Sequence, residues 1–504
     1  MPAVKSRTAD KGKKPASARQ LALDVLVRVE QDQSYSNLLL HQALSRSELN
    51  KPDAALATEL VYGTIQRLGT IDYFLARFVK GGLAKLEPWV RSLLRLSFYQ
   101  LYYLQRIPDH AAVNEAVDIA KRKGHQGISG MVNGVLRNVI RQKADLVVPD
   151  SLEPAVRIAI RHSHPEWLVR RWIAQYGEEL TERICEANNT PPHVSIRVNL
   201  MRRTRDELLA ELRREGVQAE PSPLAPAGIV VEHAGNMALH PLFRSGEFSI
   251  QDESSMLVAE FVDPKPGMAV LDCCAAPGGK TAHLAEKMED TGSIVASDIH
   301  EHKKKLIDEQ AGRLGLTCIR TLVADANELA DRFPPASFDR VLLDAPCSGF
   351  GVIRRKPEIK WTKRERDIAD IAAVQKEILH RVCRLVKPGG VLVYSTCTIE
   401  RSENDEMIRA FLQDHPEFAL ERDDVPALPV SANTPPARNA PDAGAAPEIA
   451  SAPKAAPTPP VTAVTMAEAY RSEPGMVQIF PHEFGTDGFF IAKLRRLQNG
   501  SFSS

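Results

Sequence analysis

In the second half of the chain, short apolar runs suited to strands alternate with longer segments that have the pattern of helices. The apolar runs are rich in valine, leucine and isoleucine, as in 268–271, 294–296 and 391–394. Strands that are apolar on both faces belong to a parallel sheet that helices cover on both sides. We therefore expect a doubly wound α/β domain over residues 251–424, completed by residues 466–497.

A Pro-Gly-Gly turn, Pro277 to Gly279, follows the first of these runs and leads into a predicted helix at 280–288. Glycines between the first strand and the first helix of such a sheet let the backbone approach a ligand closely. Ligands collect there, outside the carboxyl ends of the strands. Taken alone, the turn suits an ordinary strand–helix connection and a ligand cradle equally well.

Three acidic residues, Asp298, Asp325 and Asp344, end predicted strands of this sheet. Asp298 lies 20 residues after Gly278, the spacing at which an acidic side chain binds ribose hydroxyls in doubly wound folds. One such carboxylate would mean little. Three of them together with the glycine turn favour a cofactor that carries a nucleoside.

The chain has seven cysteines, with no CxxC pair and no histidine cluster at ligand spacing. This pattern indicates free thiols in a cytoplasmic setting and argues against a metal site. Cys347 and Cys397 follow predicted parallel strands, so both thiols should reach the carboxyl edge of the sheet. A buried cysteine is most often a small hydrophobic residue, and this is our interpretation of Cys185, Cys318 and Cys383.

Residues 18–143 have the apolar periodicity of helices, with glycine and proline falling between the periodic segments. We expect an all-α domain of six or seven helices over residues 18–145. A disordered basic tail at 1–17 should precede it, because that segment lacks the apolar core of a signal peptide. Basic runs at 121–123 and 137–143 are better explained as a solvated face than as an RNA contact.

Residues 146–250 are expected to form a small α/β connector. Predicted strands at 194–200 and 229–231 flank a helix at 204–214, and Thr204 is expected to begin that helix with a capping box. Three arginines of this region suit phosphate contacts and simple exposure equally well: Arg197, Arg202 and Arg203.

Proline and alanine dominate residues 425–465, which contain no aromatic residue and no cysteine. Such a segment buries too little apolar surface to offset the entropy of ordering it, so we expect a disordered insert. After it, residues 475–480 and 488–494 should form a final antiparallel pair that closes the sheet.

Composition limits the partners of the chain. Basic and acidic residues number 64 each, so any nucleic-acid site must come from local basic patches. No apolar run approaches the roughly 20 residues of a membrane span, and no membrane contact is expected. At 504 residues the chain is too long for one core, which predicts a multidomain protein.

Three segments together resemble the signature motifs of RNA cytosine-5 methyltransferases that use S-adenosylmethionine: Asp272–Lys280, Asp344–Gly349 and Ser395–Thr398. Two further segments are similar to other blocks of that family: Gly351–Trp361 and Asp487–Phe490. The helical region resembles the antitermination factor NusB, notably at Glu59–Gly63 and Val132–Arg137. A NusB-like domain ahead of a Rossmann-like catalytic domain is similar to the RsmB/Sun-type 16S ribosomal RNA methyltransferases.

The resemblance implies the chemistry. A thiolate adds to C6 of the target cytosine and makes C5 nucleophilic enough to take a methyl group. By resemblance Cys397 is this nucleophile and Cys347 assists resolution of the adduct. DNA cytosine-5 enzymes use the reverse assignment, which is the natural alternative. Asp344 is expected to hold the target ring or to contact the cofactor, and Lys280 to bind near the cofactor or the base.

The resemblance also implies the residues that bind S-adenosylmethionine. The loop that follows the first predicted strand should surround the methionine part of the cofactor. Asp298 should bind the ribose, Asp325 the adenine, and Asp344 the region near the sulfonium. The loop consists of Cys274, Ala275, Ala276, Pro277, Gly278, Gly279 and Lys280. Arg354, Arg355 and Lys356 follow a glycine-rich turn and are expected to contact RNA phosphates.

The sequence thus predicts a cytoplasmic, monomeric methyltransferase that modifies C5 of a cytosine in 16S ribosomal RNA through a covalent Cys–C6 intermediate. The same reaction on tRNA is one alternative, and the NusB-like region argues against it. A non-catalytic RNA-binding assembly factor is another, and the two thiols and three aspartates argue against it. A dinucleotide oxidoreductase is disfavoured because the turn lacks GxGxxG.

Overall fold

The computed structural model describes residues 17–32, 35–232, 235–421 and 475–498. The described chain divides into two compact units. The first comprises the residues up to Cys185 together with Lys356–Thr362, and the second Glu186–Arg355, Lys363 to Glu421 and the C-terminal segment. The expected basic tail, apart from Ser17, and the proline- and alanine-rich insert lie outside the described residues.

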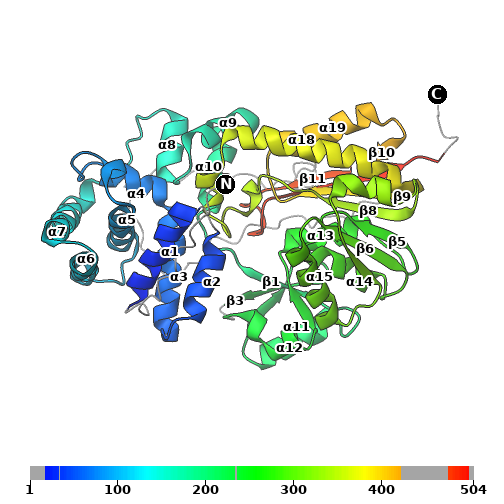
Figure 1. Ribbon diagram of the computed structural model, residues 1–504, viewed down its shortest axis with the longest axis horizontal. Helices are drawn as coiled ribbons and strands as arrows, with labels where there is room; N and C mark the ends of the chain where they lie inside the picture. Colours follow the sequence, from blue (N-terminus) through cyan, green and yellow to red (C-terminus); the bar gives the residue numbers. More distant parts are fainter. Residues whose placement is uncertain (1–16, 33–34, 233–234, 422–474, 499–504) are drawn as a thin grey trace, which may run out of the picture. The chain divides into compact units, whose positions relative to one another are not determined.

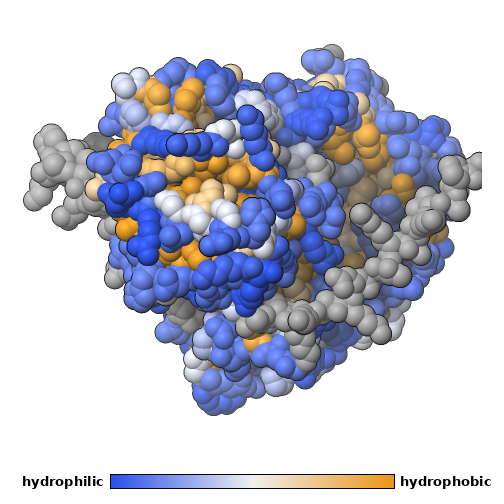
Figure 2. All heavy atoms as spheres, turned by 60° about the vertical axis from the view of Figure 1, so that its left-hand side comes forward, coloured by the Kyte–Doolittle hydropathy of each residue, from blue (hydrophilic) through white to orange (hydrophobic). Residues whose placement is uncertain are grey.

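The first unit is built of helices (Figure 1). Their bounds are α1 (Ala18–Asp32), α2 (Ser36–Ser45), α3 (Lys51–Gln66), α4 (Leu68–Leu75), α5 (Pro88–Tyr103), α6 (Asp109–Lys123), α7 (Gln126–Arg141), α8 (Pro154–Arg161), α9 (Glu166–Tyr176), α10 (Glu178–Ala187, whose last two residues belong to the second unit) and α17 (Ile359–Thr362). The seven helices up to residue 141 agree with the expected all-α region. Figure 2 brings this side of Figure 1 forward and shows apolar patches among mainly hydrophilic side chains.

Close packing of α3 against α5 explains one of the NusB-like segments. A Cβ added to Gly63 would lie 2.0 Å from the Tyr99 ring, so only glycine lets the ring of α5 pack here. The Tyr99 hydroxyl donates a hydrogen bond to Glu59, one turn earlier on α3. Glu59 and Gly63 are therefore two ends of one packing contact, which lies in a core that also contains Leu60 and Phe98.

The second unit begins with a small sheet. Its elements are β1 (Val194–Val198), α11 (Arg205–Arg214), β2 (Gln218–Pro221), β3 (Gly228–Glu232), α12 (Pro241–Arg244) and β4 (Phe248–Ile250). The strand order is β2-β3-β1-β4, with antiparallel neighbours. Because β3 lies between β1 and β2, these two strands run in the same direction and β1–α11–β2 is a split βαβ unit.

The predicted capping box is present. The Thr204 side chain accepts from the backbone N–H of Glu207, and the Glu207 side chain accepts from the Thr204 backbone. The expected connector does not form one body, because α8 and α9 belong to the first unit and the small sheet to the second.

The main sheet has the order β10-β12-β9-β8-β5-β6-β7, with β11 paired to β12. Its strands are β5 (Ala269–Asp272), β6 (Ser293–Asp298), β7 (Ile319–Val323), β8 (Phe338–Asp344), β9 (Val386–Thr396), β10 (Phe418–Leu420), β11 (Met476–Ile479) and β12 (Phe489–Arg496). The five strands from β7 to β9 are parallel, whereas β12 pairs antiparallel with β9, β10 and β11. The predicted antiparallel pair at the end of the chain is confirmed.

Helices cover both faces of this sheet (Figure 1). They are α13 (Glu253–Val262), α14 (Gly279–Lys287), α15 (Glu301–Leu314), α16 (Leu329–Arg332), α18 (Glu365–Val382) and α19 (Asp405–Asp414). Leu271 and Leu343 belong to the core that contains α18 and α19, while their neighbours Val270 and Leu342 belong to the core that contains α13 and α14. Alternate strand residues thus fill opposite cores, which is why the apolar runs are continuous.

These observations confirm the predicted fold class, an all-α region followed by a doubly wound α/β sheet. Within the described ranges, the protein contains no helix of the length and apolarity that crossing a bilayer requires.

Candidate active site

The parallel pairing of β8 with β9 brings two thiols together. Asp344 pairs with Ser395 in the register of these strands, and the Ser395 hydroxyl donates to Asp344 Oδ1 over 2.8 Å. The loops that follow carry Cys347 and Cys397, whose Sγ atoms lie 3.3 Å apart. Neither cysteine forms a disulfide, and both are partly exposed.

A second set of contacts joins the two loops next to the thiols. The hydroxyls of Ser348 and Thr398 share a hydrogen bond of 2.8 Å. The Ser348 backbone N–H donates to Glu403 Oε2 over 2.9 Å, and the Gln375 amide donates to the same oxygen over 2.8 Å. Glu403 is fully buried, and burial raises the pKa of its carboxyl. Nothing in the sequence pattern singled out Glu403, because its partners come from distant segments.

Close backbone packing fixes the Cys397 loop. The Gly351 N–H donates to the Cys397 carbonyl over 3.0 Å, and the Gly488 N–H donates to the Gly351 carbonyl over 2.8 Å. A Cβ at Gly351 would lie 1.9 Å from the Gly488 carbonyl oxygen. The two additional sequence blocks, which contain Gly351 and Gly488, therefore meet against the Cys397 loop.

Lys280 and Asp344 form an ion pair beside the thiols. Lys280 Nζ donates to Asp344 Oδ2 over 2.7 Å and lies 5.3 Å from the centre of the Phe489 ring. Burial favours the neutral amine, but Asp344 and the Cys397 sulfur outweigh it and raise the pKa of Lys280. With Ser395 on one oxygen and Lys280 on the other, the Asp344 carboxylate has a fixed orientation.

The loop from Cys274 to Lys280, which is predicted to bind the methyl donor and is here called the donor loop, follows β5 and includes the first residues of α14. The Ala275 N–H donates to the Ser297 carbonyl, and the Gly278 N–H donates to the Ala275 carbonyl, each over 2.8 Å. Gly278 has a φ of +101°, and a Cβ there would lie 3.1 Å from Ile307 Cα. The tight turn thus needs glycine both for its backbone conformation and for its approach to α15.

Arg197 contacts the backbone of this loop, so neither a phosphate contact nor simple exposure describes it correctly. Its side chain is fully buried, and it forms an ion pair of 2.8 Å with Glu286. Its guanidinium also donates to the Gly279 carbonyl over 2.8 Å and to the Gln251 side chain. Arg197 is therefore neither exposed nor free to meet a phosphate. It connects the small sheet to the donor loop.

The two other strand-end aspartates lie along the same edge. Asp298 ends β6, is 6% exposed, and accepts from the His300 N–H over 3.2 Å. Asp325 lies just beyond β7 and accepts from the Asn327 N–H over 2.9 Å. The sequence interpretation did not include Ile299, which follows Asp298 and is 53% exposed. Its exposure next to an acidic residue gives this position an apolar surface.

The structure corrects the expected phosphate contacts. Arg354 is 4% exposed, and it donates to the backbone carbonyls of Gly485, Pro481 and Ala187. Buried in this way, it offers no surface to RNA.

The two neighbours of Arg354 differ from it. Arg355 bridges Asp487 and Asp252, with contacts of 2.8 and 2.7 Å, so its guanidinium is also used inside the protein. Lys356, in the first unit, lies 5.2 Å from the Tyr35 ring centre. Its contact with RNA stays a prediction.

The remaining cysteines are partly as predicted. Cys185 and Cys383 are buried, whereas Cys318 is partly exposed. The described residues contain no group of three or more histidine, cysteine, aspartate or glutamate side chains that suits a metal ion.

Family models cover most of the chain. Residues 259–495 match the model described as 16S rRNA methyltransferase RsmB/F. Residues 16–141 match the NusB family, and residues 164–238 match the ferredoxin-like domain of RsmF/B-like methyltransferases.

Two relatives are similar over nearly their whole length. The probable ribosomal RNA small subunit methyltransferase B of Bacillus subtilis (strain 168) is 46% identical, over 96% of this chain and 99% of its own. A protein described in the same words from Synechocystis is 34% identical, over 95% of this chain and 99% of its own.

Solved structures share the fold. PH0851 superimposes with a TM-score of 0.73 at 28% identity, covering 95% of this chain and 98% of its own. NSun6 from Pyrococcus horikoshii, solved with SFG, gives a TM-score of 0.52 at 22% identity over 66% of this chain and 99% of its own. The second likeness concerns the fold alone.

The contact of Gly351 with Gly488 predicts the effect of one methyl group. Gly351→Ala places its Cβ 1.9 Å from a carbonyl oxygen, so a backbone segment must move, at a cost of roughly 1–3 kcal/mol. We expect a lower melting temperature by calorimetry. Gly130→Ala is the control, because its Cβ meets no atom within 4 Å and alanine favours a helix by about 1 kcal/mol. Equal melting of Gly351→Ala and the unaltered protein would contradict the packing described.

The buried Asp272 predicts a pH dependence of stability. Burial, together with the nearby Asp344 carboxylate, raises the pKa of Asp272 to about 7, against about 4 in an unfolded chain. The folded state holds the proton more tightly, so the stability from this group is complete below pH 4 and is lost as the pH rises through 7. The full change is of order 4 kcal/mol.

Asp272→Asn cannot ionise and should flatten this fall in the free energy of unfolding, measured by urea denaturation from pH 5 to pH 8. Asp118→Asn is the control, because the Asp118 side chain is 63% exposed. An equal pH slope for Asp272→Asn and the unaltered protein would show that Asp272 does not titrate in this range.

Proposed function

The chain belongs to the RsmB/F family of 16S rRNA methyltransferases, and from this premise we propose that it methylates C5 of a cytosine in 16S ribosomal RNA with S-adenosylmethionine as the donor. The observation that carries this proposal is the 3.3 Å approach of the Cys347 and Cys397 sulfur atoms. Methylation of a ring nitrogen or a ribose oxygen does not need a thiol. Methylation of a ring carbon does, because that carbon must first be activated covalently.

The thiolate of Cys397 adds to C6 of the cytosine. The π electrons of the C5–C6 bond then move to C5, which becomes an enamine carbon able to form a new bond. S-adenosylmethionine, when bound, would supply an electrophilic methyl group, and its sulfur would keep the electron pair of the broken methyl–sulfur bond as a thioether. Afterwards a base removes the proton from C5, the C5–C6 double bond forms again, and the sulfur of Cys397 leaves C6. The ring thus gains a methyl group, loses a proton and releases the enzyme unchanged.

The charges around the two sulfur atoms support this assignment. The hydrogen bond with Cys397 and burial raise the pKa of the Cys347 thiol well above its usual value. A thiol that keeps its proton is poorly suited to attack C6. The Lys280 ammonium lies close enough to Cys397 for the sulfur to raise the pKa of Lys280, so this cation favours the thiolate of Cys397.

Asp344 is proposed to hold the edge of the target ring. Its two oxygens are oriented by Ser395 and Lys280 over 2.8 and 2.7 Å, and a carboxylate retains further acceptor sites for the N4 amino group of a cytosine. This contact would fix the ring beside both thiols. It requires the target base to be splayed out of its stack in the RNA.

The residues present fit a nucleoside-bearing methyl donor. Asp272 Oδ1 is buried without a hydrogen-bond partner among the described residues, beneath the loop from Cys274 to Lys280 that is proposed to hold the methionine part. Asp298 offers a carboxylate for ribose hydroxyls, and the exposed Ile299 beside it offers an apolar surface for a base. Asp325 and Asp344 are proposed to complete the site at the adenine and near the sulfonium.

The two cysteine roles predict different behaviour of two variants. Cys397→Ala should abolish transfer of labelled methyl groups to 16S ribosomal RNA. Cys347→Ala should still attack but resolve slowly, leaving a denaturation-resistant protein–RNA band on gels. Cys318→Ala, outside the site, is the control and should behave as the unaltered protein. A band that forms with Cys397→Ala and not with Cys347→Ala would reverse the assignment.

Arg197 predicts a loss of cofactor affinity that is separable from stability. Removing Arg197 alone would leave Glu286 buried and unpaired, which costs roughly 3–5 kcal/mol. The double variant Arg197→Met with Glu286→Leu removes both charges and should fold. It lacks the bond to the Gly279 carbonyl, so we expect affinity for S-adenosylmethionine to fall on the order of tenfold by calorimetry. Arg202→Gln, whose side chain is 37% exposed, is the control. Unchanged affinity in the double variant would mean that Arg197 does not position the loop.

A further inference from the structure

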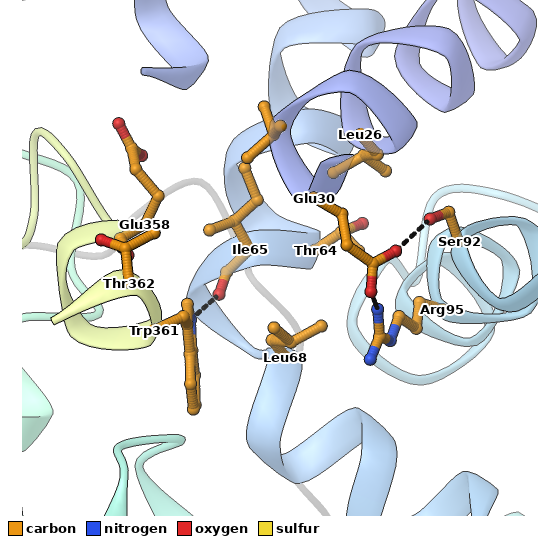
Figure 3. Close-up of a pocket in the computed structure, with 11 residues that line it drawn as sticks. Leu26, Glu30, Thr64, Ile65, Leu68, Ser92, Arg95, Glu358, Trp361 and Thr362 are labelled. Atoms are coloured by element: carbon orange, nitrogen blue, oxygen red, sulfur yellow. Dashed lines mark hydrogen bonds and ion pairs between the residues drawn. The ribbon is translucent and has the colours of Figure 1, made fainter. Parts of the chain in front are cut away.

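The helical unit contains a cavity of about 240 Å³ whose walls come from α1, α3, α4, α5 and the segment Lys356–Thr362 (Figure 3). Leu26, Ile65 and Leu68 line it together with the Trp361 indole. The Trp361 Nε1–H donates to the Ile65 carbonyl over 2.8 Å, so the ring is held at this edge. This volume is smaller than the roughly 300–1,000 Å³ of pockets for drug-sized ligands, and it suits a single ring system.

One end of the cavity is polar. Glu30 Oε1 accepts from Arg95 over 3.0 Å and from Arg91 over 2.8 Å, as Figure 3 shows for Arg95. Within the described part of the chain, Glu30 Oε2 accepts only from the Ser92 hydroxyl, over 3.4 Å. A carboxylate oxygen with one long hydrogen bond retains acceptor capacity for an N–H group.

Thr64 provides an independent sign that the cavity takes a ligand. Its side chain lines the cavity and is 2% exposed. Its hydroxyl is buried without a hydrogen-bond partner within the described part of the chain. A buried hydroxyl without a partner destabilises a fold, and a valine of the same shape would not. A ligand with a polar edge would give this hydroxyl its partner.

We propose that this cavity binds an unpaired RNA base that carries an exocyclic amino group. The inference rests on the proposed function, since it takes RNA to be the substrate. The apolar walls and the indole suit the faces of a base. The amino group would donate to Glu30 Oε2, and the Thr64 hydroxyl would pair with a neighbouring ring nitrogen. Proteins commonly read unpaired RNA bases in this way, by contact with their faces and hydrogen bonds to their edges.

Groups next to the cavity favour RNA over a protein side chain as the occupant. Glu358 lines the cavity and accepts from the Ser36 N–H and hydroxyl over 3.1 and 2.8 Å. Tyr35, the neighbour of Ser36, is 51% exposed, and the Lys356 ammonium lies 5.2 Å from its ring centre. An exposed aromatic ring and a cation close to the cavity suit a second base and a phosphate.

Thr64→Val in the full-length protein tests this inference. The variant removes an unpaired hydroxyl, so its melting temperature should rise. It should bind a fluorescein-labelled adenosine hexamer at least threefold more weakly by anisotropy, with little change for a uridine hexamer, because uracil lacks the amino group. Leu68→Phe, which fills the cavity, should weaken binding of the adenosine hexamer as well. Thr58→Val is the control, because the Thr58 hydroxyl of the same helix donates to the Ala54 carbonyl over 2.8 Å.

Unchanged affinity of Thr64→Val and Leu68→Phe for the adenosine hexamer would overturn the inference and leave the cavity to solvent or to a protein partner. Equal losses for the two hexamers would overturn it as well. Methyl transfer to 16S ribosomal RNA by the unaltered protein is measured in parallel. Absence of that transfer would count against the proposed function, whereas unchanged hexamer binding counts only against the cavity.

Discussion

The parallel pairing of β8 with β9 is the constraint on which the site depends. It sets Asp344 beside Ser395. Cys347 and Cys397 follow these two residues after only a short stretch of chain in each case. Two short loops that leave neighbouring parallel strands in the same direction must stay close. The contact between Ser348 and Thr398 and the backbone bond from Gly351 to Cys397 refine this approach to 3.3 Å between the sulfur atoms.

Buried and partly buried charges around the site hold its loops in place. Arg197 joins the small sheet to the donor loop through the Gly279 carbonyl, and Arg355 joins Asp252 to Asp487. A buried ion pair adds little net stability, because desolvation opposes the attraction between the charges. Its geometry is demanding, however, and each of these arginines fixes segments that are far apart in sequence. We infer that they define the shape of the edge where the thiols and aspartates meet.

Much of this arrangement followed from local sequence patterns. Apolar runs located the parallel strands, and the strand ends then located Asp298, Asp344, Cys347 and Cys397, because the carboxyl ends of parallel strands share one edge. The capping box at Thr204 is also a local signal. The environments of Arg197 and Arg354 were not predictable, since an arginine in a sequence gives no sign of its distant partners. The same holds for Glu403, and for the division of the expected connector, which depends on packing between remote helices.

The central claim is that Cys397 forms the covalent bond to the RNA base. RNA that contains 5-fluorocytidine tests it most directly, because a base can remove a proton from C5 but cannot remove fluorine, so the adduct persists. Digestion of that adduct and mass spectrometry identify the modified peptide. The account predicts the nucleotide on the peptide that contains Cys397. A nucleotide attached to the peptide that contains Cys347 would contradict it.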